Sequence, residues 1–196
     1  MGTIILQVVG TTAFVVGTLL LGLYLRRHPT KKAAVRTSRV SHTLYWLGLV
    51  LPGFTGIIHP GLAQFDQILG LPSLPARPLT LGLGIAAVAV GVTLTLLSQM
   101  ALRRLGEGTN AFRLTRRLVA GYLYARTRNP MSLGYYLICV GLGLLAGSTY
   151  VTLGSLLGVV PVHVFNLLYF EEQELALRLG PSYLEYKRTV PFLIPG

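Results

Sequence analysis

Two short polar motifs flank a long apolar stretch in the second half of this 196-residue sequence. Arg128-Asn129-Pro130 comes before the stretch and Glu171-Glu172 comes after it, and residues 131–170 contain no Lys, Arg, Asp or Glu. This length fits two membrane-crossing helices joined by a turn at residues 146–149, because each crossing needs about 20 apolar residues. A chain that crosses and returns brings both motifs to the same membrane face. We therefore expect them to form one site at the membrane surface.

The first motif predicts the start of a helix with anion-binding groups. Proline is favoured at the first helical position and asparagine at the capping position before it, so Asn129 and Pro130 are expected to begin a helix. Its free backbone N–H groups would bind a carboxylate or a phosphate, and Arg128 adds a planar fork of donors. The alternative is a simple helix start beside an interfacial arginine.

The second motif gathers negative charge where a helix end disfavours it. Three of the six acidic residues, Glu171, Glu172 and Glu174, closely follow the apolar stretch, and the C-terminal end of a helix is unfavourable for anions. Binding of hydroxyls, an amine or a cation would explain the cluster. Ion pairing with arginines is the alternative, and we assign Glu174 to it, since Arg178 lies four residues further along the same helix face.

One histidine lies inside the apolar stretch. His163 follows Pro161 closely, and an ionisable residue within a membrane-spanning segment is a functional candidate by default. The alternative is a packed, hydrogen-bonded histidine. His28, His42 and His59 lie at the edges of apolar segments, where we interpret them as interfacial. The spacing of the histidines does not resemble a zinc site, so no metal site is predicted.

The composition predicts an all-α, multi-pass membrane protein. Apolar residues make up 52% of the chain and charged residues 12%, whereas soluble domains carry about 25% charged residues. Because no linker or repeat divides the chain, residues 1–196 are interpreted as a single membrane domain. We predict a helical bundle of about five spans, at residues 4–25, 43–58, 79–102, 130–146 and 150–170, followed by a helical tail.

The positive charges predict the orientation of the spans. In this layout Arg77 is the only one of the 17 Lys and Arg residues that lies outside the segments predicted to be cytosolic, as the enrichment of Lys and Arg in cytosolic loops requires. The N-terminus is then outside and the C-terminal tail is cytosolic, with the inner cell membrane as the expected location. The net charge of +11 favours contact with anionic lipid headgroups. Nucleic acid is not an expected partner, because no basic stripe alternates with stacking aromatic residues.

Two glycine pairs, Gly143 with Gly147 and Gly154 with Gly158, have the four-residue spacing of closely packed membrane helices. We interpret both pairs as packing positions without a functional role.

The second half of the chain also carries an ordered set of short motifs. These are Gly106-Glu107-Gly108-Thr109, Leu118-Val119, Tyr124, Arg128-Asn129-Pro130-Met131, Gly134, Glu171-Glu172, Gly180-Pro181-Ser182-Tyr183-Leu184-Glu185-Tyr186 and Val190-Pro191. Their order and spacing resemble the integral-membrane methyltransferases that include isoprenylcysteine carboxyl methyltransferase and the phospholipid N-methyltransferases. The resemblance covers about residues 103–195, which would form the catalytic, cofactor-binding core.

The resemblance implies S-adenosylmethionine as the cofactor and methyl transfer to a lipophilic membrane substrate, either an isoprenylcysteine-type carboxylate or a phospholipid amine. The residues implied to bind the cofactor are Gly106, Gly108, Tyr124, Arg128, Asn129, Pro130, Met131, Gly134, Glu171 and Glu172. Catalytic roles are expected for Arg128, His163 and Glu171. An amine acceptor must be neutral to react, which would give His163 or a glutamate a role as a base.

The chain departs from this pattern at two places. Tyr122-Leu123 replaces a usual Gly-Pro, and Ser132 replaces a usual aromatic residue. Two other hypotheses stay open: an NADPH-dependent reductase of the sterol-reductase type, because its tail is similar, and a non-catalytic membrane scaffold, because of these departures. The acidic pair argues against the reductase. The sequence determines neither the acceptor nor the oligomeric state.

Overall fold

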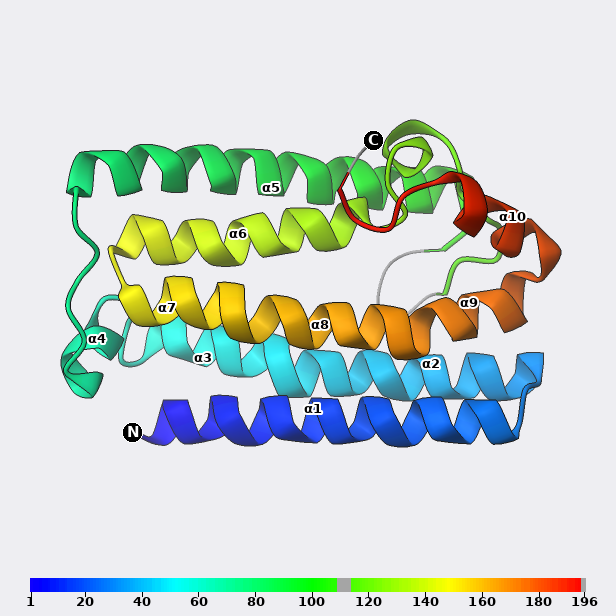
Figure 1. Ribbon diagram of the computed structural model, residues 1–196, viewed down its shortest axis with the longest axis horizontal. Coiled ribbons are helices and arrows are strands. Elements are labelled where there is room, and N and C mark those ends of the chain that lie inside the picture. The colour runs from blue at the N-terminus through cyan, green and yellow to red at the C-terminus, as the bar shows by residue number, and fades with distance from the viewer. Residues whose placement is uncertain (109–113, 195–196) are drawn as a thin grey trace.

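The computed structural model describes residues 1–108 and 114–194, and the regular structure within them is entirely helical. Long helices lie side by side in one bundle (Figure 1). Three rods of this bundle are single helices: α1 (Gly2–Arg27), α5 (Arg77–Leu105) and α6 (Pro130–Ala146). This arrangement confirms the predicted all-α class.

Two further rods consist of segments that follow one another without a break. The first contains α2 (Lys31–Tyr45), the π-helical turn η1 (Trp46–Val50) and α3 (Leu51–Ile58). The second contains α7 (Thr149–Gly154), η3 (Ser155–Val159), α8 (Val160–Asn166), η4 (Leu167–Glu171) and α9 (Glu172–Leu179), where η3 and η4 are also π-helical. The shorter elements are α4 (Gln64–Leu69), the 3₁₀ turn η2 (Tyr122–Ala125) and α10 (Pro181–Thr189).

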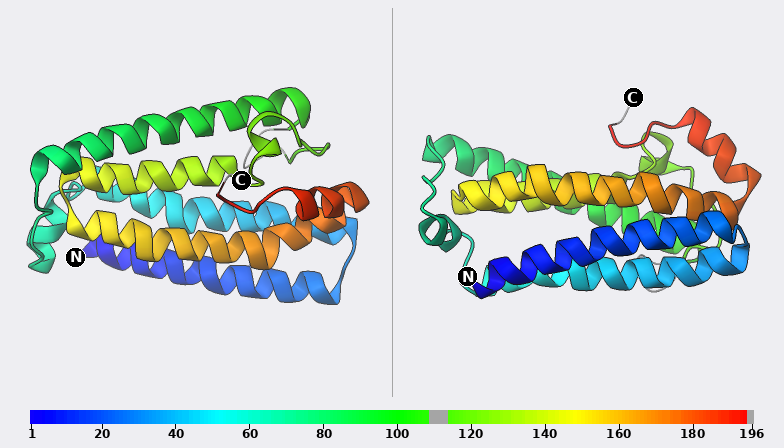
Figure 2. Two further views of the ribbon diagram at one scale, coloured as in Figure 1. Left: turned by 45° about the horizontal axis from the view of Figure 1, so that its top comes forward. Right: turned by 60° about the horizontal axis from the view of Figure 1, so that its bottom comes forward.

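The two ends of the bundle differ in charge. The basic end carries the α1–α2 connection, the end of α5, the start of α6, and α9 with α10, whereas α4 and the α6–α7 turn lie at the opposite end (Figures 1 and 2). Arg77, the exception to the predicted charge pattern, lies at that opposite end. It donates to the carbonyl oxygens of Leu144 at 3.2 Å and Leu145 at 2.6 Å. A cation there complements the negative end of the α6 dipole.

Several helices have the properties of membrane spans. Residues 2–27, 77–105 and 149–179 form helices that are long and apolar enough to cross a membrane, and residues 130–146 form a shorter apolar helix. Large apolar side chains on these helices, such as Leu83 at 52% and Leu157 at 70%, are exposed, which is typical of surfaces that face lipid. These features indicate a membrane protein, while the number of spans and their orientation stay predictions.

The rod that contains α2 begins at Lys31, well before the predicted start at residue 43. The Thr30 hydroxyl caps it by accepting a hydrogen bond from Ala33 N at 3.1 Å. The span predicted at residues 43–58 is therefore the second part of a longer helical rod. The basic residues lie on an amphipathic helix whose buried face consists of small residues such as Ala34 and Ser38, and hydropathy alone does not detect such a helix.

The last rod continues to Leu179, beyond its predicted end at residue 170. Glu171, Glu172 and Glu174 therefore lie within the rod, and the unfavourable helix end that the sequence interpretation assumed does not apply to them. As predicted, Glu174 pairs with Arg178 one turn later, with Oε1 and Nε 2.5 Å apart.

The hairpin between α6 and α7 is held by a buried carboxylate. Gly147 ends α6 at a φ of +67°, in the left-handed region that favours glycine. Asp66 of α4 is 2% exposed and accepts hydrogen bonds from Ser148 Oγ at 3.1 Å, Thr149 N at 2.8 Å and Tyr150 N at 2.8 Å. One anion thus fixes the start of α7, where the helix dipole favours negative charge.

Asp66→Ala is expected to lower the free energy of unfolding by roughly 2–4 kcal/mol, because each buried donor that loses its acceptor costs about 1–3 kcal/mol. Asp66→Asn keeps one acceptor oxygen and should cost less. Thermal unfolding of the detergent-solubilised proteins measures the order of stability. Equal midpoints for wild type and Asp66→Ala would contradict this role of the carboxylate.

Glycines permit the closest helix contacts. A Cβ atom added to Gly91 on α5 would lie 2.6 Å from the carbonyl oxygen of Gly134 on α6, and the reverse contact is equally close. Gly10 on α1 and Gly48 of η1 form a second such crossing, also at 2.6 Å. Any larger side chain at these positions would push the rods apart.

The predicted packing of the spaced glycine pairs holds in part. Gly143 packs against α7, where an added Cβ would lie 2.6 Å from Thr152 N. At Gly154 and Gly158 an added Cβ would meet no heavy atom of the described chain within 4 Å. The packing prediction is wrong for this pair, and both glycines line a cavity instead.

Candidate active site

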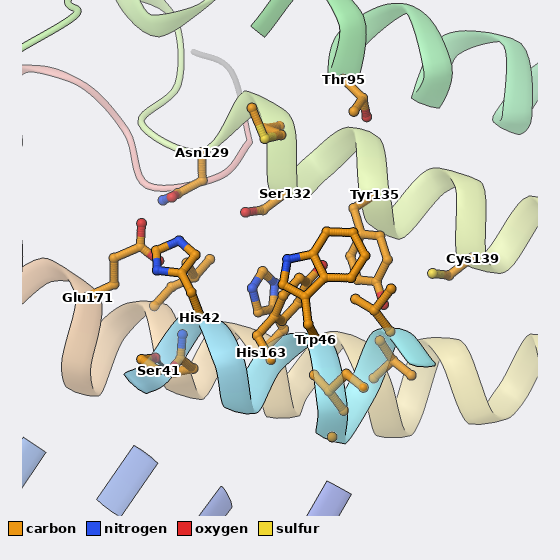
Figure 3. Close-up of a pocket in the computed structure, with 18 of the residues that line it drawn as sticks. Ser41, His42, Trp46, Thr95, Asn129, Ser132, Tyr135, Cys139, His163 and Glu171 are labelled. Carbon is orange, nitrogen blue, oxygen red and sulfur yellow. Dashed lines mark hydrogen bonds between the residues drawn. The ribbon is translucent and has the colours of Figure 1, made fainter. Parts of the chain in front are cut away.

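A cavity of about 990 Å³ lies inside the bundle, between α6 and the two composite rods (Figure 3). Apolar side chains such as Leu49, Leu142 and Val151 form much of its wall. Toward the basic end the wall becomes polar through Ser41, His42, Asn129, Ser132, His163 and Glu171. A polar end joined to an apolar wall suits a ligand that has a charged head and an apolar tail.

Glu171 contributes a carboxylate to this polar end. Figure 3 shows its side chain pointing into the cavity. Within the described residues no hydrogen bond or ion pair reaches this carboxylate, whereas Glu172 and Glu174 each have basic partners. A partly buried carboxylate without a partner costs free energy, so a cationic ligand bound here would be strongly stabilised.

Glu172 joins the start of α6 to the tail. Its Oε1 lies 2.5 Å from Arg128 Nη2 and its Oε2 lies 2.6 Å from Lys187 Nζ. We call these three residues the tail clasp. Arg128 also donates through Nη1 to the carbonyl oxygens of Lys187 at 2.7 Å and Val190 at 2.8 Å. Arg128 and Glu172, predicted to bind the cofactor, are thus engaged in holding the tail on the bundle.

One nitrogen of Arg128 is left over for a ligand. Its Nε is buried and has no hydrogen-bond partner in the described part of the chain, while Arg128 lines the cavity. Since buried N–H groups are nearly always satisfied, a ligand acceptor is the natural partner for this donor.

Backbone and side-chain hydrogen bonds fasten the rest of the tail to the loop before α6. Arg128 N donates to Pro191 O at 2.9 Å, and Tyr186 Oη donates to Tyr124 O at 2.7 Å. Burial raises the pKa of Tyr186 to about 12, partly opposed by the nearby Arg128 charge, so its phenol stays a neutral donor. Tyr124, a predicted cofactor residue, is buried and lines the cavity.

The start of α6 lies where the sequence predicts it. Pro130 is the first helical residue and Asn129 occupies the capping position. The Asn129 side chain makes no capping hydrogen bond to the helix, and its Nδ2 donates to Phe192 O of the tail at 2.9 Å. Met131 and Ser132 of the first turn line the cavity together with Asn129.

His163 is both packed and placed at the cavity wall. It is 8% exposed, its Nδ1 lies 3.0 Å from Tyr136 Oη, and its ring centroid lies 4.9 Å from that of Tyr45. The two interpretations of this histidine are therefore compatible, since a hydrogen-bonded, packed ring also contacts the cavity.

The described part of this chain thus brings Arg128, Asn129, His163 and Glu171 to one cavity. A model of the phospholipid methyltransferase family matches residues 79–180, which is just over half of the chain. The chain belongs to this family. Searches of curated proteins and of solved structures found no match.

The family match extends from the start of α5 to the end of α9, so it covers the acidic pair and ends before α10. Membership in the phospholipid methyltransferase family confirms the predicted superfamily and indicates methyl transfer in general. The match excludes α1 and the α2–α3 rod, although both line the cavity.

The glycine loop of this methyltransferase lies beside the cavity wall. Gly106 O accepts a hydrogen bond from Arg116 N at 2.8 Å, and an added Cβ at Gly106 would lie 3.1 Å from a methyl carbon of Val119. Gly106 and Gly108 are not among the described residues that line the cavity. Thr109, which completes the motif, falls outside the described residues. Cofactor contact by this loop stays a prediction.

Two other predicted cofactor residues serve the helix framework. Gly134 forms the crossing with Gly91, and Pro130 is buried at the helix start. Neither Gly134 nor Pro130 is among the described residues that line the cavity. The crossing allows α6 to pack closely against α5.

The departures from the family pattern have different consequences. Tyr122 has a φ of +55° and is 78% exposed, so the glycine that is usual there would relieve backbone strain. Ser132 lines the cavity, where its small side chain leaves room that an aromatic ring would fill. The serine at position 132 therefore changes the space for a ligand, whereas the tyrosine at position 122 changes the backbone of the loop.

Sequence reasoning missed His42, which lies in the cavity wall with Ser38, Ser41 and Tyr45. The sequence did contain a signal for this placement, because these four residues have the spacing of one helix face. It could be recognised only with a helix that starts at Lys31, and the predicted start at residue 43 hid it.

Proposed function

We propose that this protein transfers a methyl group from S-adenosylmethionine to a lipophilic acceptor that enters the cavity from the bilayer, with a phospholipid amine as the favoured acceptor. The carboxylate of Glu171, facing a cavity of about 990 Å³, is the observation that carries the proposal. Membership in the phospholipid methyltransferase family supports the reaction type.

The side chains at the polar end fit the charges of this cofactor, which has an ammonium, a sulfonium and a carboxylate. Glu171 attracts the two cationic groups. Arg128 Nε and the backbone N–H groups at the start of α6 are donors for the carboxylate. The bound cofactor supplies an electrophilic methyl group, and the chain holds the two reactants together and excludes water.

The cavity wall supports an acceptor with an apolar tail. Gly154 and Gly158 leave space along the last rod, beside the apolar side chains of Leu49 and Val151. A cationic head is attracted by Glu171, whereas the carboxylate of an isoprenylcysteine-type acceptor is repelled by it. A lipid amine is therefore the better fit of the two acceptors.

The basic end is proposed to face the cytosol and the anionic headgroups of the inner cell membrane, as the distribution of Lys and Arg favours. The cavity mouth near Glu171 would then be open to the cytosolic cofactor.

The arrangement of arginines argues against the NADPH-dependent reductase. In the described residues each arginine that lines the cavity pairs with a glutamate: Arg117 with Glu107, Arg128 with Glu172, and Arg178 with Glu174. The phosphates of NADPH would have to compete with these carboxylates, and Glu171 would repel them.

Calorimetric titration of the purified protein with S-adenosylhomocysteine tests the proposal, with NADPH as the comparison ligand. Saturable binding of S-adenosylhomocysteine alone is expected. Binding of NADPH alone would support the reductase instead. Binding of neither ligand by protein shown to be folded would support a non-catalytic scaffold.

A further inference from the structure

His42 lies in the wall of the cavity outside the segment matched by the family model. Figure 3 shows its imidazole projecting from α2 toward Asn129, which precedes α6, and Ser132 of α6, at the end of the cavity that also contains Glu171. A titratable ring placed there is available to a ligand that occupies the polar end.

A hydrogen bond determines which ring nitrogen carries the proton. Nδ1 of His42 lies 2.9 Å from the carbonyl oxygen of Ser38. Since a carbonyl oxygen only accepts, Nδ1 must be the donor, and in the neutral ring Nε2 then holds a lone pair. The helix thus fixes the tautomer in which Nε2 can accept a proton.

Other titratable groups surround this ring in the cavity wall. They are Glu171 of η4, Glu174 and Arg178 of α9, His163 of α8, Tyr135 of α6, Arg128 of the loop before α6, and Tyr45 of the same helix as His42. Glu172 and Glu174 are engaged in ion pairs, and His163 is enclosed by three tyrosine rings. His42 is half-buried, its tautomer is fixed by the hydrogen bond to Ser38 O, and it lines the ligand space.

We propose that Nε2 of His42 is the base that removes a proton from the ammonium head of a lipid acceptor. This inference rests on the proposed function and on its lipid amine acceptor, since a carboxylate acceptor needs no base. Glu171 would hold cationic groups by charge, while His42 would act on the acceptor nitrogen.

The proton and electron balance is simple. Nε2 takes one proton from the ammonium, which leaves a lone pair on the acceptor nitrogen. That lone pair forms the new nitrogen–carbon bond while the bond from the methyl carbon to sulfur breaks, and its electron pair stays on sulfur. The imidazolium returns its proton to water at the basic end, and the product is a methylated ammonium with a neutral thioether.

His42→Asn is the sharpest test, because the asparagine amide can still donate to Ser38 O but offers no base. Wild type and variant are compared in nanodiscs of phosphatidylethanolamine with labelled S-adenosylmethionine, from about pH 6 to about pH 9. His28→Asn is the matched control, since His28 is exposed at the α1–α2 connection and outside the cavity wall.

The variant is expected to lose roughly 10²- to 10⁴-fold in rate at neutral pH, which is the usual contribution of a general base. The loss should shrink as the pH rises, because the lipid ammonium then deprotonates without help. Affinity for S-adenosylhomocysteine should stay within about twofold of wild type, because His42 is proposed to act on the acceptor nitrogen and not on the cofactor.

Two results would overturn the inference while leaving methyl transfer intact: an unchanged rate in His42→Asn, or a rate loss matched by an equal loss of S-adenosylhomocysteine affinity. Nitrogen NMR of wild type provides a test that needs no turnover. A protonated Nε2 with a bare Nδ1 in neutral His42 would also overturn it, even if the variant failed to fold. Absence of S-adenosylhomocysteine binding by wild type would instead contradict the proposed function.

Discussion

Glu171→Gln is expected to weaken binding of S-adenosylhomocysteine by roughly 10- to 100-fold, because a hydrogen bond to a charged group contributes about 1.5–3 kcal/mol. The carboxylate faces the cavity and has no protein partner within the described residues, so its replacement leaves no protein donor without an acceptor. Stability should therefore stay the same or rise slightly, since a half-buried charge is removed. Calorimetry and thermal unfolding measure the two effects separately.

Glu185→Gln is the matched control for this variant. Glu185 is exposed on α10 and lies outside the cavity wall, so this substitution should change neither quantity. Equal affinity of wild type and Glu171→Gln for S-adenosylhomocysteine would show that the carboxylate does not contribute to binding. A loss of stability in Glu171→Gln would show that the carboxylate has a structural partner instead.

Arg128→Ala is expected to destabilise the protein by about 3–5 kcal/mol, the cost of leaving one partner of a buried ion pair alone. Glu172 is 7% exposed between Arg128 and Lys187, and the carbonyl oxygens of Lys187 and Val190 would also lose a donor. In a protein of this size the midpoint of thermal unfolding should fall by roughly 10 °C. The tail should become sensitive to limited proteolysis.

Arg117→Ala is the control, because Arg117 and Glu107 form an exposed pair with side chains 73% and 43% accessible, and such pairs contribute about 0–1 kcal/mol. Removing both partners in Arg128→Ala/Glu172→Ala should destabilise less than the sum of the single variants. Strict additivity, or a cost for Arg128→Ala no larger than that for Arg117→Ala, would contradict the tail clasp.

The helical hairpin was predictable from the sequence because its signals are local. The charge-free run from 131 to 170, Pro130 at its start and Gly147 in its middle define α6 and its turn. The pair of Glu174 and Arg178 was predictable for the same reason, since partners four residues apart meet on any helix.

The tail clasp was not predictable, because its partners are far apart in the sequence. Arg128 and Glu172 were expected to share one site, because the hairpin returns both motifs to the same face. Nothing in the sequence indicated that these two residues form an ion pair or that Lys187 joins them. The carboxylate of Asp66, which holds the start of α7 from helix α4, is a second such case. Contacts of this kind depend on how the rods pack, which periodicity does not define.

The missed start of α2 had a consequence for the site. Thr30 after Pro29 is a capping signal that precedes the basic segment, but the predicted span began only at residue 43. Because the helix was not recognised, His42 was interpreted as interfacial and its place in the cavity was lost.

The central claim, methyl transfer to a membrane lipid, is tested most directly by incubating the protein in phosphatidylethanolamine nanodiscs with S-adenosylmethionine labelled in its methyl group. We predict that wild type forms labelled, N-methylated lipid and that Glu171→Gln forms little or none. Folded wild-type protein that transfers no label, either to phosphatidylethanolamine or to any lipid of a total membrane extract, would contradict the account.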